Sequence, residues 1–475
     1  KNFSYQKKEG IRTFIRFDGV YMDSKVYVNG ALAGEWKYGY SAFMFDITDL
    51  VKNGENVVTV RVDHHSPNSR WYSGAGIFRK VWLCESPEIR FGNDGIYITT
   101  SKQEDGWQVT VKAEMLRPVG TPLGGIRIRN TIFDKDGKEV ASYESDACGA
   151  DISCIPEAVR VKGVSYSLTA QTMTVKDPEL WDIASPVLYT MVSEIIVDGG
   201  CVQRVGQKFG FRTIKFKCDS GFYLNGRHVK LHGSCEHHDN GCLGAVSNPA
   251  AIRRRFKKLR KMGINAIRTS HNMPAEEFMD IADETGMLIL SEGFDMWERS
   301  KTDYDYARFF DEWVEKDVAS WVRRDRNHPS IIGWSVGNEI FDTHADERGQ
   351  EVTAWLKRLV RLHDPDGNGY VTFGSNYMQW ENGQKCADIL KLAGYNYGER
   401  LYEEHHAAHP DWMIYGSETA SVVQSRGIYH FPLSETLLTD DDEQCSSLGN
   451  SCTGWGAKNT EACIIPDRDA EYCAG

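Results

Sequence analysis

Hydrophobic and polar residues alternate along short segments in the first part of the chain, which is the pattern of half-buried β-strands. Residues 25–28 (KVYV) end at the turn Asn29-Gly30, and residues 57–62 (VVTVRV) show the same alternation. Turn dipeptides of this kind connect antiparallel strands. We therefore predict an all-β module over residues 1–87.

A second β-rich stretch covers residues 88–218. Its expected strands include residues 107–111, 125–134 and 188–197, and Asp136-Gly137 forms a turn signal between two of them. The length of this stretch and the spacing of its turns fit a second β-sandwich.

From about residue 219 the pattern changes to apolar runs that alternate with amphipathic segments, as in parallel βα units. A helix is predicted over residues 249–262, because Asn248 suits the N-cap and Gly263 suits the end. Seven apolar runs are expected to form strands: residues 229–233, 264–268, 287–290, 331–336, 370–373, 392–395 and 413–415. Because eight such units close a TIM barrel, we predict an α/β (βα)8 barrel over residues 219–475 that lacks its last strand.

Charge and composition narrow the choice of ligand. The 475 residues include 55 Lys and Arg against 67 Asp and Glu, which gives a formal net charge of −12. An acidic protein repels phosphate backbones, so no nucleic acid partner is expected. No segment approaches the roughly 20 apolar residues of a membrane-spanning helix, so no membrane contact is expected. The 13 Trp and 21 Tyr fit a carbohydrate substrate, although large cores use aromatic residues as well.

The chain ends, cysteines and histidines give weaker signals. The sequence begins with Lys1 inside a strand-like region and stops without an eighth apolar run, so we expect it to be part of a longer protein. The 12 cysteines show no Cys-x-x-Cys spacing, which argues against a zinc framework. His405 and His409 have metal-like spacing but are interpreted as part of an outer helix. Cys445 and Cys452 form either a disulfide or two free thiols, and a disulfide would favour a periplasmic or extracellular location over the cytoplasm.

Two glutamates directly follow predicted barrel strands, at the end where barrel active sites gather. Glu339 follows residues 331–336, and Glu418 follows residues 413–415. Glycosidic cleavage requires one acid that protonates the leaving oxygen and one carboxylate on the other face of the sugar. Carboxyl groups about 5 to 5.5 Å apart retain the anomeric configuration, whereas a wider gap inverts it. A purely structural role in strand-end salt bridges stays open as the alternative.

Three segments resemble motifs of glycoside hydrolase family 2. Residues 323–339, RRDRNHPSIIGWSVGNE, resemble its acid/base signature, and residues 415–421, YGSETAS, resemble the nucleophile strand of its β-galactosidase-like members. Residues 72–79, YSGAGIFR, resemble the motif that closes its N-terminal sugar-binding domain. The resemblance implies three domains in this order: a jelly-roll-like sandwich (1–87), an immunoglobulin-like sandwich (88–218) and a catalytic TIM barrel (219–475).

The resemblance also implies roles for individual residues. Glu339 is expected to be the acid/base and Glu418 the nucleophile, while Asn338 is expected to bond the sugar 2-hydroxyl. Tyr397 is similar in place to the tyrosine that hydrogen-bonds the nucleophile, with a barrel-packing role as the alternative. A retaining double displacement would follow from these roles.

Three histidines match substrate-contacting positions of the family. His271, within RTSHN, resembles the histidine that follows the second strand. His237 and His238 follow the first strand and resemble another sugar-facing site. The sequence does not show which of these two neighbours faces the sugar.

The sequence departs from the magnesium-dependent branch of the family after the third strand. Met296 stands where that branch has a metal-binding glutamate, so no metal and no organic cofactor are expected. Glu292 and Asp295 are candidates to orient sugar hydroxyls, and Trp297 is a candidate to stack on the sugar. A packed structural role is the alternative for each.

These observations predict a retaining exo-β-glycosidase that acts on terminal β-galactosides. The alternatives are a β-glucuronidase or β-mannosidase of the same family, and a carbohydrate-binding protein without catalysis. An adhesion module is disfavoured because it would leave Glu339 and Glu418 unexplained. By analogy with the family, we expect a homo-oligomer formed through the sandwich domains.

Overall fold

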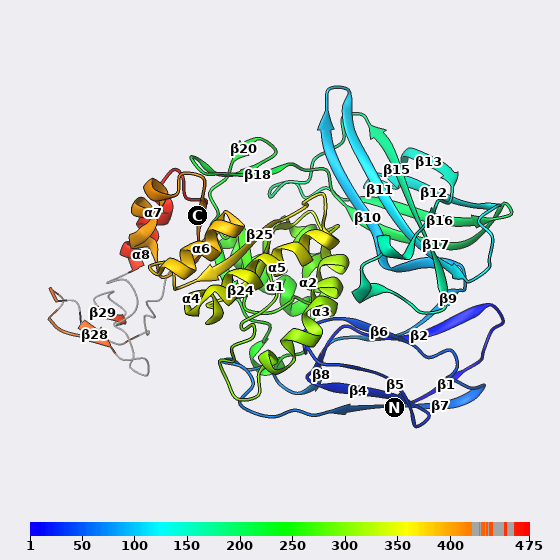
Figure 1. Cartoon of the computed structure of the whole chain (residues 1–475). Helices are drawn as coiled ribbons and strands as arrows, with labels where there is room; N and C mark the ends of the chain where they lie inside the picture. Colours follow the sequence, from blue (N-terminus) through cyan, green and yellow to red (C-terminus); the bar gives the residue numbers. More distant parts are fainter. Residues whose placement is uncertain (420–426, 428, 433, 436, 440–450, 454–459) are drawn as a thin grey trace.

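The computed structural model describes residues 1–419, 427, 429–432, 434–435, 437–439, 451–453 and 460–475. Two β-sandwiches, coloured blue and cyan to green in Figure 1, lie beside a parallel sheet that is surrounded by helices. This arrangement confirms the predicted fold class. The domain boundaries near residues 87 and 218 stay a prediction.

The first sandwich is formed by two antiparallel sheets and a short strand pair. One sheet has the order β1-β7-β4-β5, the second has the order β6-β2-β9, and β3 pairs with β8. Apolar side chains from both sheets, among them Ile15, Phe17, Val26 and Phe43, pack between them. The strands are β1 (Asn2–Tyr5), β2 (Ile11–Phe17), β3 (Val20–Tyr21), β4 (Ser24–Val28), β5 (Ala31–Trp36), β6 (Phe43–Asp46), β7 (Gly54–Val62), β8 (Gly76–Ile77) and β9 (Val81–Pro87).

The second sandwich also has two antiparallel sheets, with the orders β10-β11-β15-β14 and β13-β12-β16-β17. Its core contains the alternate residues Val109 and Val111 of one sheet and Ile128 and Met191 of the other, all without exposed surface. The strands are β10 (Arg90–Gln103), β11 (Gly106–Pro118), β12 (Ile126–Phe133), β13 (Glu139–Asp146), β14 (Gly149–Ala150), β15 (Val164–Val175), β16 (Tyr189–Val197) and β17 (Gly200–Phe209). Two short 3-10 helices, η1 (Ile152–Cys154) and η2 (Glu157–Val159), precede β15.

A curled sheet of seven parallel strands forms the barrel. Its order follows the sequence: β21 (Gly233–Glu236), β22 (Ala266–Thr269), β23 (Leu288–Glu292), β24 (Ile331–Asn338), β25 (Tyr370–Ser375), β26 (Leu392–Asn396) and β27 (Met413–Glu418). The first strand begins at Gly233, so the prediction of a strand over residues 229–233 was wrong by a few residues. Val229 and Leu231 are buried in the core below the sheet instead. This core also packs against a small antiparallel sheet before the barrel: β18 (Ile214–Lys217), β19 (Gly221–Leu224) and β20 (Arg227–His228).

The end of the chain lies against the last barrel strand. The N–H of Ala474 donates to the carbonyl of Ile414 at 2.8 Å, and the N–H of Gly416 donates to the carbonyl of Gly475 at 2.8 Å. On the other side, the N–H of Leu231 donates to the carbonyl of Ala474 at 2.8 Å. Residues 473–475 therefore bridge β27 and the segment before β21. No eighth strand joins the sheet within the described part of the chain.

Helices cover the outside of the barrel sheet (Figure 1). They are α1 (Pro249–Lys261), α2 (Glu276–Thr285), α3 (Phe310–Asp325), α4 (Asp342–Ala345), α5 (Glu347–His363), α6 (Glu381–Leu390), α7 (Tyr402–Ala408) and α8 (Thr460–Asp469). Asn248 caps α1 as expected, because its Oδ1 accepts from the N–H groups of Ala250 and Ala251. Three 3-10 helices, η3 (Gly241–Leu243), η4 (Tyr306–Phe309) and η5 (Glu399–Leu401), and the strand pair β28 (Leu437–Thr439) and β29 (Ser451–Thr453) complete the described elements.

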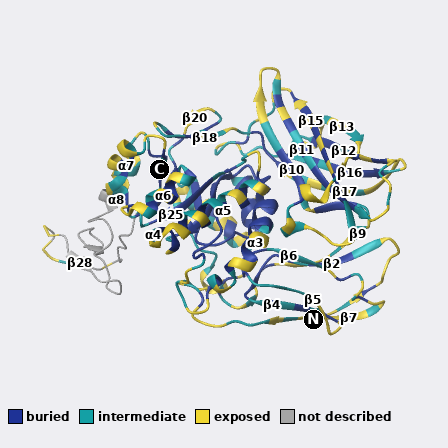
Figure 2. Ribbon diagram, viewed as in Figure 1, coloured by how far each residue is buried: buried dark blue, intermediate teal, exposed yellow. Residues whose placement is uncertain are grey.

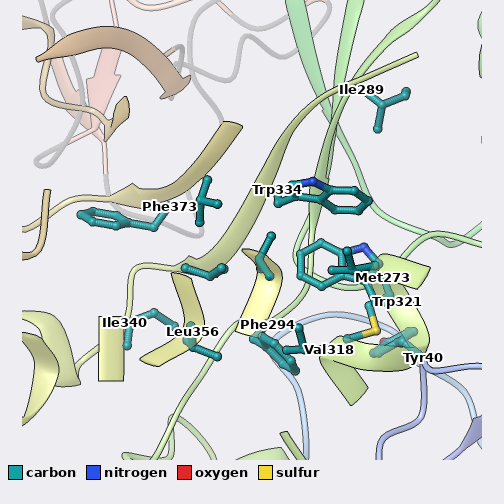
Figure 3. Close-up of a cluster of buried hydrophobic side chains, with 14 of the residues drawn as sticks. Tyr40, Met273, Ile289, Phe294, Val318, Trp321, Trp334, Ile340, Leu356 and Phe373 are labelled. Atoms are coloured by element: carbon teal, nitrogen blue, oxygen red, sulfur yellow. The ribbon is translucent and has the colours of Figure 1, made fainter. Parts of the chain in front are cut away.

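The largest hydrophobic core lies between the barrel sheet and its helices. In Figure 3, Trp321 of α3 lies beside Trp334 of β24, and their ring centroids are 5.3 Å apart. Tyr40 of the first sandwich belongs to the same cluster as the barrel residue Phe294, so the two domains share one core. Figure 2 shows that the barrel strands are buried, while the outer faces of the helices are exposed. This shared core gives the first sandwich a fixed position beside the barrel.

Candidate active site

A pocket with a volume of about 820 Å³ lies at the C-terminal ends of the barrel strands. Both Glu339 and Glu418 line it, so the structure brings together the two acids that the strand-end rule singled out. Two further residues, Arg70 and Trp71, come from the first sandwich. The complete lining is Arg70, Trp71, His237, His271, Glu339, Asn376, Gln379, Asn396, Tyr397, Arg400 and Glu418.

Glu418 ends β27 and is held by two donors. Its Oε1 lies 2.7 Å from Nη1 of Arg268, and its Oε2 accepts a hydrogen bond from the hydroxyl of Tyr397. Burial raises the pKa of Glu418, but Arg268, His271 and Tyr397 outweigh burial, so the pKa lies below that of an ordinary glutamate. The carboxyl group of Glu418 therefore stays ionised, as a nucleophile requires.

Glu339 follows β24 in a left-handed backbone conformation, with φ of 45°. Residues other than glycine rarely adopt this region, and such strain persists only where the surrounding structure fixes it. The N–H of Glu339 donates to the carbonyl of Gly374 at 2.7 Å, which fixes the turn on the neighbouring strand. The side chain turns into the pocket, where Oε1 accepts from Nδ2 of Asn396 at 3.1 Å and Oε2 lies 3.5 Å from Nη1 of Arg70.

The consecutive residues Asn396 and Tyr397, at the end of β26, contact different acids. Asn396 donates to Glu339, whereas Tyr397 donates to Glu418 through its hydroxyl and, at 2.7 Å, through its backbone N–H to the Glu418 carbonyl. Tyr397 also has a left-handed backbone, with φ of 54°. One sharp turn therefore positions both carboxyl groups relative to each other.

A buried network fixes the pocket residue His271. Glu292 has no exposed surface, and its oxygens accept from Nε of Arg268 at 2.9 Å and Oγ of Ser335 at 2.5 Å, while Nδ1 of His271 lies 2.7 Å away. This arrangement aims Nε2 of His271 at Glu418, 3.5 Å away. Glu292 was expected to orient sugar hydroxyls directly. In the structure its carboxylate is occupied and buried beneath the pocket, which fits the structural alternative, and a contact with a sugar stays a prediction.

Asp295 is likewise buried rather than open to a sugar. Its carboxylate binds Arg70 through two hydrogen bonds of 2.6 and 3.0 Å, and it binds Nζ of Lys301 at 2.9 Å. Burial raises the pKa of Asp295, but Lys301 and Arg70 outweigh burial and lower the pKa to about 2. Asp295 therefore holds two cations beside Glu339, which fits the structural alternative. A direct contact between Asp295 and a sugar stays a prediction.

Asn338 has no exposed surface. Its Oδ1 accepts from Arg268 at 2.8 Å and from Asn396 at 3.0 Å, and its Nδ2 donates to Asp295 at 2.9 Å. Asn338 therefore contacts Arg268, which binds Glu418, and Asn396, which binds Glu339. The expected contact of Asn338 with a sugar 2-hydroxyl stays a prediction, and it would use the second N–H of the amide.

The two neighbouring histidines occupy different environments. His237 lines the pocket, with ring centroids 5.2 Å from Trp71 and 5.4 Å from His271. His238 packs among aromatic rings, 5.0 Å from Tyr40, and burial together with the charge of Arg79 lowers its pKa to about 3. Of the two histidines, His237 therefore lines the pocket, and a contact of His238 with a sugar stays a prediction.

Trp297 does not face the pocket. It is fully buried, and its Nε1 donates to the carbonyl of Val336 at 2.8 Å. This position fits the structural alternative for Trp297, and stacking on a sugar stays a prediction. Trp71 instead places an indole ring in the pocket, 5.6 Å from His271, and its Nε1 donates to the hydroxyl of Tyr40 at 3.1 Å.

Several residues around the acids were not predicted from the sequence: Arg70, Trp71, Arg268, Lys301, Asn376, Gln379, Asn396 and Arg400. Arg268 had a detectable signal, because it is a charged residue inside a short apolar strand, where only a paired charge is tolerated. Arg70 and Trp71 directly precede the motif over residues 72–79. They were not predicted because they lie in the first sandwich, whereas the site residues were sought at the ends of barrel strands.

Within the described residues, no group of three or more His, Cys, Asp and Glu side chains is arranged to hold a metal ion. No described helix has the length and apolar character needed to cross a membrane. His405 is buried in α7, where its ring packs 6.1 Å from Trp412 and 6.3 Å from His409. Cys445 and the side chain of Cys452 lie outside the described residues.

The family models that match this sequence follow the order of the domains. The model described as "Glycosyl hydrolases family 2, sugar binding domain" matches residues 2–87. The model "Glycosyl hydrolases family 2" matches residues 93–212, and "Glycosyl hydrolases family 2, TIM barrel domain" matches residues 215–410.

Two curated relatives carry different substrate names. "Beta-galactosidase BoGH2A" of Bacteroides ovatus is 36% identical over 517 residues, covering 100% of this chain and 59% of the relative. A "Putative beta-glucuronidase" of Formosa agariphila is 38% identical over 363 residues, covering 76% of this chain and 33% of the relative. The chain therefore spans less than two thirds of the length of either relative.

Solved structures agree with this comparison. A glycosyl hydrolase family 2 member from Bacteroides cellulosilyticus is 34% identical, with a TM-score of 0.79 over 88% of this chain and 54% of that chain. A β-glycosidase from Bacteroides vulgatus is 27% identical, with a TM-score of 0.82 over 100% of this chain and 61% of that chain.

Proposed function

Because the chain belongs to glycosyl hydrolases family 2, we propose that it carries the active site of a retaining exo-β-glycosidase that releases terminal β-linked galactose. One observation carries the proposal: Glu339 and Glu418, from the ends of β24 and β27, line the same pocket. In it, Glu418 is held ionised beside Arg268 and Tyr397.

The reaction proceeds in two displacements. In the first, the Glu418 carboxylate attacks the anomeric carbon while Glu339 donates its proton to the leaving oxygen, so that the glycosidic bond breaks and a glycosyl ester forms. In the second, Glu339 accepts a proton from water, the water oxygen attacks the anomeric carbon, and Glu418 leaves as the carboxylate. The anomeric configuration is inverted twice and therefore retained.

The residues around the acids prepare these steps. Arg268 and Tyr397 keep Glu418 ionised and oriented, and Asn396 orients Glu339. Trp71, His237 and His271 form the wall on which an apolar sugar face packs. In this proposal only carboxyl groups and water react. The homo-oligomer expected from the resemblance stays a prediction.

Galactose is the proposed sugar because the relative named β-galactosidase matches the whole chain. A β-glucuronidase is the second candidate, and the position of Arg400 supports it. Arg400 lines the pocket with an exposed side chain, and its Nη1 donates to the carbonyl of Tyr397 at 2.8 Å. A guanidinium at the pocket mouth is suited to pair with the carboxylate of a glucuronide.

The test is hydrolysis of p-nitrophenyl β-galactoside, β-glucuronide and β-mannoside by the full-length protein. A preference for the galactoside that is lost in Glu418→Gln and retained in Glu404→Gln, on the surface of α7, supports the proposal. A preference for the glucuronide keeps the mechanism and changes the sugar. A folded protein that binds sugars but hydrolyses none of the three substrates would contradict the proposal and favour a carbohydrate-binding protein.

A further inference from the structure

Four aromatic rings form a cluster at the rim of the pocket, on the side of Glu339. Phe341 and His344 lie just after Glu339, and Tyr377 and Trp380 follow the neighbouring strand β25. The ring of His344 lies 4.0 Å from Tyr377, 4.7 Å from Trp380 and 6.1 Å from Phe341, and Tyr377 lies 5.7 Å from Trp380. We call these four residues the aromatic cluster.

The aromatic cluster presents apolar rings to solvent. Trp380 is 47% exposed and Phe341 is 37% exposed, which is unusual for large apolar side chains that gather at one site. In the loop after β25, the N–H of Trp380 donates to the carbonyl of Tyr377 at 3.0 Å. In addition, Nδ2 of Asn382 on α6 donates to the carbonyl of His344 on α4 at 3.4 Å. These hydrogen bonds, together with the contacts between the rings, fix the positions of the two segments that carry the aromatic cluster.

The cluster and the pocket are continuous. Asn376 and Gln379, which line the pocket, belong to the same loop as Tyr377 and Trp380. Burial raises the pKa of Tyr377, and the nearby charge of Glu339 raises it further, which agrees with a position of Tyr377 beside this acid.

The proposed reaction determines on which side of the pocket the leaving group of the substrate lies. The acid/base protonates the oxygen that departs with the leaving group, so the leaving group must extend from the pocket on the side of the acid/base. Glu418 and its partner Arg268 come from β27 and β22, and Tyr397 follows β26. The aromatic cluster follows Glu339 and β25, and the loop after β25 continues into the pocket through Asn376 and Gln379.

We propose that the aromatic cluster is the leaving-group site, where the apolar face of a second pyranose ring of an oligosaccharide stacks on Trp380 and Phe341. The inference rests on the proposed glycosidase function and extends it to the substrate class: the natural substrates carry a sugar, rather than a small group, on the reducing side. Binding energy from this second ring is used to hold the glycosidic oxygen against Glu339.

The test compares two donors that share the sugar in the pocket and differ in the leaving group. One is a β-linked disaccharide, and the other is the corresponding β-glycosyl fluoride, whose leaving group has no ring. The measured quantity is the ratio of kcat/KM for the disaccharide to kcat/KM for the fluoride. In Trp380→Ala and Phe341→Ala we expect this ratio to fall by about tenfold or more. Trp380→Phe retains a flat ring and is expected to keep most of the ratio.

Trp82→Ala is the matched control, because Trp82 is 46% exposed on the first sandwich and lies on β9. Its ratio is expected to equal that of the parent protein. If the ratio is unchanged in both Trp380→Ala and Phe341→Ala, or if Trp380→Phe loses as much as Trp380→Ala, stacking at the cluster is wrong. If the parent protein turns over neither donor with any of the three sugars tested above, the proposed function fails and the leaving-group site fails with it.

Discussion

The Arg70 guanidinium of the first sandwich binds the Asp295 carboxylate of the barrel in a bidentate pair, with Nη2 2.6 Å from Oδ1 and Nε 3.0 Å from Oδ2. Nη1 of the same guanidinium lies 3.5 Å from Oε2 of Glu339. The first sandwich therefore contributes a charge to the proposed catalytic site, in addition to its packing against the barrel. The contact is also directional, because a guanidinium fork matches a carboxylate only in a few orientations.

Arg70→Met is expected to lower kcat/KM by about 10- to 100-fold, because the neutral side chain leaves Asp295 with one cation and removes the positive charge beside Glu339. The measurement is steady-state hydrolysis of the best p-nitrophenyl glycoside, with thermal unfolding as a check of the fold. Arg61→Met, which breaks an exposed pair with Asp63 on the same sandwich, should change kcat/KM less than twofold. Equal rates for the two variants would contradict a role of Arg70 in the reaction.

Tyr397→Phe is expected to shift the acidic limb of the kcat/KM profile to higher pH. A carboxylate with a lowered pKa stays ionised as the pH falls, and Tyr397 is one of the groups that lower the pKa of Glu418. Because the hydroxyl hydrogen bond is lost, the pKa rises and the nucleophile becomes protonated at a higher pH. Tyr395→Phe, which removes a hydroxyl 3.0 Å from His405, is the control. An unchanged limb would exclude this role of Tyr397.

Lys301→Met is expected to destabilise the fold. Nζ of Lys301 is buried between Asp295, at 2.9 Å, and the carbonyl of Asn338, at 2.7 Å, so its removal leaves the buried carboxylate with Arg70 as its one bound cation. Breaking one partner of a buried pair costs roughly 3 to 5 kcal/mol. Urea unfolding of the barrel measures this change.

The double variant Lys301→Met with Asp295→Asn should recover part of that loss, because the buried charge disappears with its partner. Lys385→Met, which breaks an exposed pair with Glu381 on α6, is expected to cost less than about 1 kcal/mol. If the single variant at Lys301 is as stable as the variant at Lys385, the buried ammonium does not support the site.

The strands and the two acids could be predicted because the signal is local. The apolar runs over residues 331–336 and 413–415 form β24 and β27, and a residue that directly follows a barrel strand must lie at its C-terminal end. The position of Glu339 and Glu418 in one pocket thus follows from chain order.

The residues that contact these acids are brought there by packing between segments far apart in the sequence. Such packing does not appear in the pattern of apolar and polar residues. Arg70 lies 225 residues from Asp295 in sequence, and the pair exists only because the first sandwich packs against the barrel. Similarly, the motif does not show that His237 faces the pocket while His238 faces Tyr40, because this depends on the path of one loop after β21. The sequence therefore does not show which of the strand-end residues line the pocket and which are buried beneath it.

Asp317 of α3 is a buried carboxyl group between the first sandwich and the barrel. Its Oδ1 accepts from Oγ of Ser41 at 2.6 Å and from Nε1 of Trp36 at 2.9 Å, and its Oδ2 accepts from the hydroxyl of Tyr306. Burial raises the pKa of Asp317 to about 7, although these donors act in the opposite direction. The carboxyl group is therefore protonated in the fold over a range in which the unfolded chain already carries its charge.

This raised pKa fixes the sign of a stability change with pH. The protonated Asp317 contributes its full stabilisation below the unfolded pKa of 3.8, and this contribution is lost as the pH rises through about 7, by roughly 4 kcal/mol in total. Asp317→Asn does not titrate and can still accept from Ser41 and Trp36, so its Tm relative to the parent protein should rise between pH 4 and pH 8. Glu315→Gln, on the exposed face of the same helix, controls for general charge effects. If the difference in Tm between Asp317→Asn and the parent protein is constant over this range, Asp317 keeps an ordinary pKa and the contact between the domains is not pH-sensitive.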